Sequence, residues 1–164
     1  MSKKVRFQPQ RLLALAAYLE KLPRKRFDYR TWVGDDWQGD QKLSCGTTAC
    51  ALGHGPSVPS LYRAGLRLRY AYRNSSNDLF PNAIHDVYLA VVGHRIRDTS
   101  SFGTSIKAAC IVFGIDEDDA QFLFNPGYES ERWDRFAPAV YATAKQVAKH
   151  IRRYVKDMQK EFGK

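Results

Sequence analysis

The stretch VYATAKQVAKHIRRYVKDMQKEF, residues 140–162, decides the fold class of this 164-residue chain. Its apolar side chains recur every three or four residues, as they do on one face of an α-helix. They are Val140, Ala144, Val147, Ala148, Ile151, Val155, Met158 and Phe162. Six basic residues form a contiguous stripe opposite that face: Lys145, Lys149, Arg152, Arg153, Lys156 and Lys160. The sequence therefore predicts an amphipathic, basic C-terminal helix over about residues 137–162.

Helical signals also appear in four other segments. Leucines and alanines at helical spacing predict a helix from Pro9 that ends before Pro23. A second helix begins near Thr104 and ends at Gly114, and Asp116 caps a third that Pro126 closes. A short helix is expected within 47–53, capped by Thr47 or Thr48 and ended by Gly53 and Gly55, with Pro56 and Pro59 forbidding its continuation.

One region has strand character instead. Residues 66–72, LRLRYAY, alternate with the period of two that is typical of a half-buried strand. Residues 86–92, DVYLAVV, are β-branched and aromatic, and are expected to pair with the first strand. A helix carrying Tyr62, Leu66 and Tyr70 is the competing interpretation. The expected fold is mainly α: a single compact helical domain, residues 1–164, with a small β-hairpin insertion at about 66–92.

Composition narrows the class of protein. No apolar run approaches the ~20 residues of a membrane span, and residues 12–19 are not followed by a signal-peptide cleavage pattern. The three cysteines, an odd number, argue against a secreted disulfide framework. We therefore expect a cytoplasmic protein with no membrane partner, present as a monomer or a homodimer.

The formal net charge of +9 is unevenly spread along the chain. Residues 1–34 hold nine basic and two acidic side chains, and residues 137–164 hold seven and two. Residues 101–136 hold three basic and seven acidic ones. Basic ends around an acidic middle suggest a polyanion or an acidic partner, although solvated helix faces would give the same pattern.

The basic residues divide into three groups of candidate nucleic-acid ligands. They are the six residues of the C-terminal stripe, the segment Arg24, Lys25 and Arg26, and the strand residues Arg67 and Arg69. Tyr70 and Tyr72 interleave with the strand arginines and offer rings for base stacking. Six phosphate contacts would lower affinity roughly a thousandfold between 50 and 200 mM salt. The alternative is a solvated helix surface on which Asp157 and Glu161 pair with nearby lysines.

Residues 45–55, CGTTACALGHG, carry the densest chemistry in the chain. Cys45, Cys50 and His54 are weak candidate zinc ligands, with Cys110, His85 or His94 as a fourth, but their spacing is looser than a C-x2-C knuckle. Cys45 is also a weak candidate nucleophile, with His54 or His85 as its base. The favoured interpretation is structural: Cys50 packs as a small apolar residue, and His54 bonds a carbonyl or an aspartate. No cofactor is expected on that interpretation.

Three stretches together resemble a set of small uncharacterised bacterial and phage proteins. They are the leucine-rich segment that leads through Leu-Pro into Arg-Phe-Asp-Tyr-x-x-Trp at 15–32, Cys-Gly-Thr-x-x-Cys-Ala-x-Gly-His at 45–54, and FGIDEDDAQFLFNP at 113–126. The resemblance covers about half of the chain and implies a bacterial or phage origin. No activity is established for that set, so it transfers no site residue.

The function favoured by the sequence is non-catalytic binding of a polyanion, nucleic acid above all, through the C-terminal helix. One alternative is an accessory protein that docks on a host or cellular protein complex. A second is a cysteine-dependent enzyme that uses Cys45.

Overall fold

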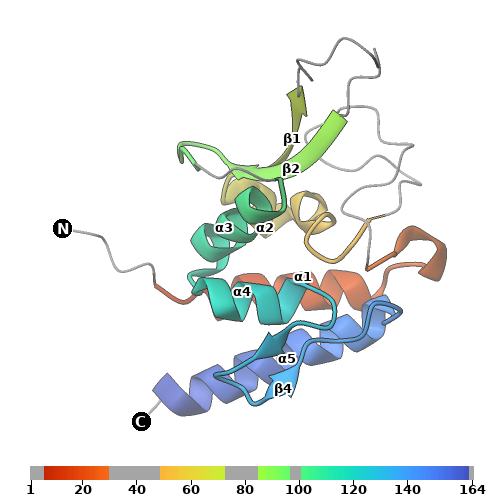
Figure 1. Ribbon diagram of the computed structural model, residues 1–164, viewed down its shortest axis with the longest axis vertical. Helices are drawn as coiled ribbons and strands as arrows, with labels where there is room; N and C mark the ends of the chain where they lie inside the picture. The colour runs from red at the N-terminus through yellow and green to blue at the C-terminus, as the bar shows by residue number, and fades with distance from the viewer. Residues whose placement is uncertain (1–5, 30–48, 73–84, 97–100, 163–164) are drawn as a thin grey trace.

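The computed structural model describes residues 6–29, 49–72, 85–96 and 101–162 and confirms a mainly α-helical fold with a small β-hairpin (Figure 1). Its α-helices are α1 (Pro9–Glu20), α2 (Pro59–Arg63), α3 (Ser101–Phe113), α4 (Glu117–Phe124) and α5 (Ala144–Phe162). Its strands form two antiparallel pairs, β1 (Leu66–Tyr72) with β2 (His85–Val91), and β3 (Glu129–Ser130) with β4 (Arg135–Phe136). Two short 3-10 turns complete it, η1 (Arg24–Arg26) and η2 (Gly55–Ser57).

The elements are stacked along the long axis of the molecule. In Figure 1 the β1–β2 hairpin lies at the top, α2 and α3 lie below it, α1 and α4 follow, and α5 lies at the bottom. α3 contacts both the hairpin and α4, and α1 contacts both α3 and α5. The hairpin and α5 therefore occupy opposite ends of the fold.

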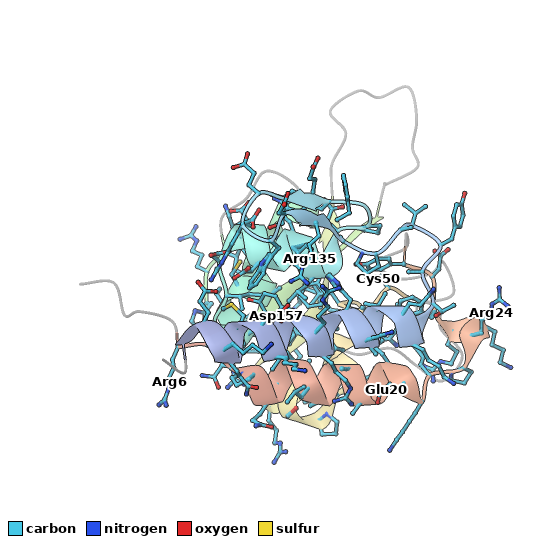
Figure 2. The ribbon with its side chains drawn as sticks, turned by 90° about the horizontal axis from the view of Figure 1, so that it is seen from below. Arg6, Glu20, Arg24, Cys50, Arg135 and Asp157 are labelled. Atoms are coloured by element: carbon cyan, nitrogen blue, oxygen red, sulfur yellow. The ribbon has the colours of Figure 1, made fainter. Side chains whose placement is uncertain are left out.

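The seam between α1 and α5 forms the lower half of the core. The two helices run antiparallel, side by side (Figure 2). Helical spacing places their apolar side chains toward this seam, where they are almost fully excluded from water. The buried residues are Leu12, Leu15, Ala16 and Leu19 of α1 and Val147, Ala148, Ile151, Tyr154, Val155 and Met158 of α5.

The predicted hairpin forms: β1 has the predicted bounds, and β2 begins and ends one residue earlier than predicted. Leu66 lies opposite Val91 and Leu68 opposite Leu89, and all four side chains are buried, as period-two alternation requires. The competing helix through residues 62–70 is wrong. The chain leaves α2 at Gly65, whose φ of +97° favours glycine and turns the backbone into β1.

Two acidic residues of α4 hold the β3–β4 hairpin in place. Asp119, whose side chain is only 1% exposed, accepts hydrogen bonds from Trp133 Nε1 (2.7 Å) and Arg132 Nη1 (3.0 Å). Asp118 accepts from Ser130 Oγ (2.6 Å) and Tyr128 Oη (2.9 Å). Both carboxylates therefore accept hydrogen bonds from residues of the same fold. Asp116 caps α4, as predicted, by accepting a hydrogen bond from the backbone N–H of Asp119.

The structure corrects the prediction in two places. Residues 49–54 contain no helix: Ala49 forms a parallel bridge with Phe27, and a turn follows at 51–54. Thr47 and Thr48 lie outside the described residues. Pro59 begins α2, because a proline at the first helical position loses no hydrogen bond.

The second correction concerns the start of the C-terminal helix. α5 begins at Ala144 rather than near 137, because Thr143 and Gln146 cap it reciprocally. The Thr143 backbone N–H donates to Gln146 Oε1 (2.7 Å), and the Gln146 backbone N–H donates to Thr143 Oγ1 (3.3 Å). Within the described part of the chain, no helix has the length and apolar character needed to cross a bilayer.

We predict that Gly114→Ala destabilises the fold much more than Gly127→Ala. Both glycines have positive φ, +67° and +73°, so each alanine costs about 1 kcal/mol of backbone strain. A Cβ at Gly114 would also lie 2.1 Å from the carbonyl oxygen of Arg6, whereas nothing lies within 4 Å of one at Gly127. In urea unfolding, the free energy of unfolding of Gly114→Ala should be at least about 1 kcal/mol lower than that of Gly127→Ala. Equal losses would contradict this packing.

Candidate nucleic-acid interface

The outer face of α5 is a continuous basic surface. Its six basic side chains, Lys145, Lys149, Arg152, Arg153, Lys156 and Lys160, are all exposed, and we call them the basic face. The buried residues of α5 lie on the opposite side of the helix, against α1. Packing of the apolar side therefore leaves the basic side turned toward solvent.

The arginines of the basic face have acidic neighbours. Arg152 donates from Nε (2.7 Å) and Nη2 (2.9 Å) to the carboxylate of Glu20 on α1, which lowers the pKa of Glu20. Arg153, 68% exposed, has its Nε 4.0 Å from Asp157, which also binds Arg135 (2.9 Å). Exposed ion pairs typically contribute less than about 1 kcal/mol, so both arginines can exchange these partners for a phosphate.

The four lysines of the basic face differ from its arginines. None of the ion pairs within the described residues includes Lys145, Lys149, Lys156 or Lys160. The sequence suggested that Asp157 and Glu161 pair with nearby lysines. In the structure both carboxylates bind arginines instead. Glu161 binds Arg132 (3.0 Å), and Asp157 binds Arg135.

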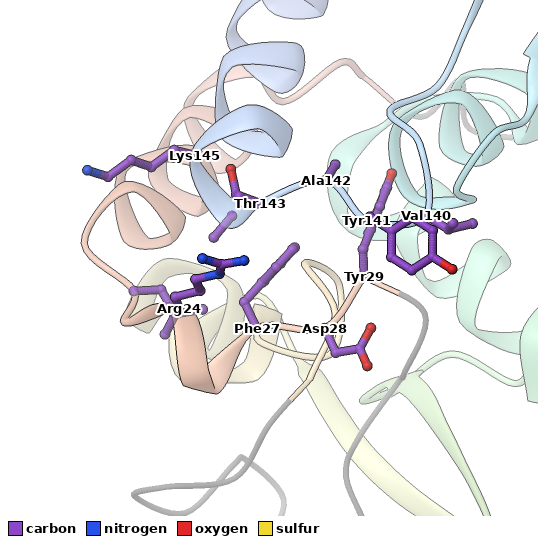
Figure 3. Close-up of a pocket in the computed structure, with 11 residues that line it drawn as sticks. Arg24, Phe27, Asp28, Tyr29, Val140, Tyr141, Ala142, Thr143 and Lys145 are labelled. Carbon is purple, nitrogen blue, oxygen red and sulfur yellow. The ribbon is translucent and has the colours of Figure 1, made fainter.

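The antiparallel α1–α5 seam brings the second basic group next to the first. η1 directly follows α1, so Arg24 lies at the N-terminal end of α5 (Figure 2). Arg24 and Lys145 line a common cavity of about 590 Å³ between η1 and the start of α5 (Figure 3). Lys25 is exposed beside them, and Arg26 is half-buried. Segments separated by more than one hundred residues thus form one basic surface.

The third basic group is separate. Arg67 and Arg69 lie on β1, at the opposite end of the long axis from α5 (Figure 1). The guanidinium of Arg67 stacks 3.3 Å from the centre of the Tyr62 ring and donates to the carbonyls of Tyr62 and Leu66. Arg69 is exposed. The structure therefore does not unite the strand arginines with the basic face.

Cys50 is enclosed in the core. Its Sγ accepts a weak hydrogen bond from the backbone N–H of Gly53 (3.4 Å), and burial raises the pKa of its thiol to about 11. A thiol with a raised pKa holds its proton at neutral pH and is a poor nucleophile. Cys45 lies outside the described residues.

His54 is also enclosed, with 0% of its surface exposed. Its Nε2 lies 2.7 Å from the carbonyl oxygen of Arg26, and because a carbonyl only accepts, Nε2 carries the proton. Burial lowers the pKa of the ring to about 4, so it is neutral at pH 7. A buried ring that donates to the backbone is poorly placed to take a proton from a substrate.

The residues considered as a fourth metal ligand are dispersed. Cys110 is half-buried on α3, His94 is exposed after β2, and His85 begins β2. Among the described residues, no group of three or more His, Cys, Asp or Glu side chains could hold a metal ion.

Comparisons with known proteins identify no family for this chain. No protein-family model matches the sequence, and no curated protein or solved structure is significantly similar to it. The resemblance of the three sequence stretches to small bacterial and phage proteins stays a prediction.

Sequence reasoning missed one part of the site, the cavity beside α5. Its walls come from residues 22–29 and 140–145, and they include the exposed Tyr141. The capping pattern Thr143-x-x-Gln146 would have placed the start of α5, and Tyr141 would then have fallen in the segment before it. The approach of Arg24 to that segment depends on tertiary packing and has no signal in the sequence.

We predict that His54 gives the fold a specific dependence on pH. The unfolded ring has a pKa near 6.5 and the folded ring about 4, so the unfolded state binds the extra proton between these values. The stabilisation is full above about pH 6.5 and is lost as the pH falls toward 4. A shift of this size corresponds to about 3 kcal/mol.

Urea unfolding at pH 7, 6, 5 and 4 measures this effect. His54→Gln keeps a donor for the Arg26 carbonyl but cannot titrate, so its stability should fall less steeply than that of the wild-type protein. His94→Gln, at an exposed position, should leave the slope unchanged. A wild-type slope in His54→Gln would show that the pKa of the His54 ring is the same in the folded and unfolded protein, and would contradict this prediction.

Proposed function

We propose that this protein binds nucleic acid, without catalysis, through the basic face of α5 and the adjoining η1 turn. The observation that supports the proposal is the set of four exposed lysines on one helix face, none of which pairs with a carboxylate of the described residues. Lysines that are not neutralised inside the protein attract phosphates and release their counterions.

The spacing of the basic face suits a phosphate backbone. Lys145 and Lys160 are 15 residues apart, which corresponds to about 22 Å along a helix. That length matches about six phosphates of one duplex strand, at ~3.4 Å per phosphate along the axis. The face can therefore follow a nucleic-acid backbone over several nucleotides.

The distribution of acidic residues also supports the proposal. Asp118 and Asp119 point into the contact between α4 and the β3–β4 hairpin, where tyrosine, serine, tryptophan and arginine side chains donate to them. Part of the acidic middle of the sequence is therefore engaged in hydrogen bonds within the protein. Less of its charge remains to oppose a polyanion at α5.

The test is the double substitution Lys149→Glu with Lys156→Glu. It should weaken binding of a labelled oligonucleotide at least about tenfold at 50 mM salt. The slope of log affinity against log salt should become smaller by about 2, one for each lost phosphate contact. Arg152 is left intact, because its pair with Glu20 joins α5 to α1.

The matched control is Arg63→Glu with Arg95→Glu, which changes the net charge equally at two exposed positions outside α5. It should retain most of the affinity. Equal losses in the two double variants would mean that only total charge matters. Wild-type affinity in Lys149→Glu with Lys156→Glu would remove α5 as the binding surface.

A second candidate function is docking on a host or cellular protein complex, as an accessory protein. Phe136, Val140 and Tyr141 are exposed within six residues of one another, 63% exposed in the case of Phe136. Exposed aromatic residues are enriched in protein interfaces. A stoichiometric protein partner that is lost on Phe136→Ser, together with no nucleic-acid binding at low salt, would favour this function over the first.

A further inference from the structure

The cavity beside α5 has the size and position of a ligand site. Its volume of about 590 Å³ falls within the ~300–1,000 Å³ that is typical of sites for small molecules. It lies at the N-terminal end of the basic face, where Lys145 is both a member of that face and part of the cavity wall. A nucleic-acid strand that follows the basic face would therefore pass the opening of the cavity.

Positive charge lies at one side of the cavity. The guanidinium of Arg24 extends toward Thr143, and Lys145 stands at the rim above it (Figure 3). Both side chains belong to exposed residues, and neither takes part in an ion pair within the described residues. The carboxylate of Asp28 lies on the other side, away from Arg24 (Figure 3). A phosphate is attracted to the first side.

Three aromatic side chains, Phe27, Tyr29 and Tyr141, also line the cavity. Phe27 stacks on Tyr29, with ring centres 6.1 Å apart and planes inclined by 21°. Tyr29 is buried and donates from its hydroxyl to the carbonyl of Leu123 (3.0 Å), so the ring beneath Phe27 is fixed. Tyr141, 81% exposed, extends from the segment before α5. A large aromatic side chain so open to water offers a ring face to a flat ligand.

We propose that this cavity receives one unpaired nucleotide of a single-stranded nucleic acid. Its phosphate lies at Arg24 and Lys145, and its base stacks on Tyr141 beside Phe27. Adjacent phosphates continue along the basic face, so the inference rests on the proposed function and narrows it to single strands. Bases in a duplex are held in the stack, whereas those of a single strand can swing out onto aromatic side chains.

The test compares Tyr141→Ala with Phe136→Ala, which removes another exposed aromatic ring outside the cavity. The probes are labelled 15-nucleotide single strands of DNA and of RNA, and a 15-base-pair DNA duplex, all at 50 mM salt. Tyr141→Ala should weaken binding of at least one single strand by about fivefold or more, the loss expected for one stacked base. Its affinity for the duplex should stay within twofold, and Phe136→Ala should resemble the wild-type protein with every probe.

A spectroscopic readout identifies the stacking itself. 2-Aminopurine placed within the single strand should lose fluorescence on binding the wild-type protein and recover most of it with Tyr141→Ala. Matched thermal unfolding of the two variants confirms that both are folded. Losses of equal size for single strands and duplex, or no loss for either, would overturn the nucleotide site.

The outcomes also separate this inference from the proposed function. If Lys149→Glu with Lys156→Glu weakens every probe but Tyr141→Ala weakens none, the basic face binds nucleic acid and the cavity does not. If the wild-type protein binds no probe at 50 mM salt, both proposals fail. A wild-type protein that binds only the duplex would overturn the single-strand inference alone.

Discussion

Burial of the apolar side of α5 against α1 is the constraint on which the rest of the structure depends. A 19-residue helix with apolar residues on one side can be stable only if that side is covered. α1 provides most of the cover, and Trp133 of the β3–β4 turn packs on Tyr154. The opposite side is then necessarily exposed, and it carries six basic residues. Because the two helices are antiparallel, the turn after α1 also meets the start of α5, which joins Arg24 to the basic face and forms the cavity (Figures 2 and 3).

Ion pairs between acidic residues of α4 and α5 and the arginines of the β3–β4 hairpin hold α5 from another side. Arg132 contacts Asp119 at the start of α4 and Glu161 near the end of α5, so it links the two helices through the β3–β4 hairpin. Arg135 forms a parallel link to Asp157. Acidic side chains of α5 are therefore drawn toward the arginines of this hairpin. The lysines of the basic face are left without them, and charge is segregated on a helix that carries both signs.

Periodicity alone predicted much of the fold, because α1, α3, α4, α5 and the β1–β2 hairpin each bury one regular face. It failed where partners distant in the sequence decide the backbone. Ala49 is extended because it pairs with Phe27, and the short β3–β4 hairpin depends on Asp118 and Asp119. The composition of the basic face was likewise evident from the sequence. The pairing of Arg152 with Glu20, the stacking of Arg67 on Tyr62 and the cavity beside Tyr141 all require tertiary structure.

The central claim is that the basic face of α5 contacts nucleic acid, and lysine footprinting tests it most directly. The protein would be briefly acetylated with and without a 15-nucleotide single strand at 50 mM salt, and each lysine quantified by mass spectrometry. We predict that Lys145, Lys149, Lys156 and Lys160 become protected, whereas Lys107 on α3 reacts equally in both samples. Unchanged reactivity along α5 while the oligonucleotide is bound would contradict the claim and place the nucleic acid elsewhere on the molecule.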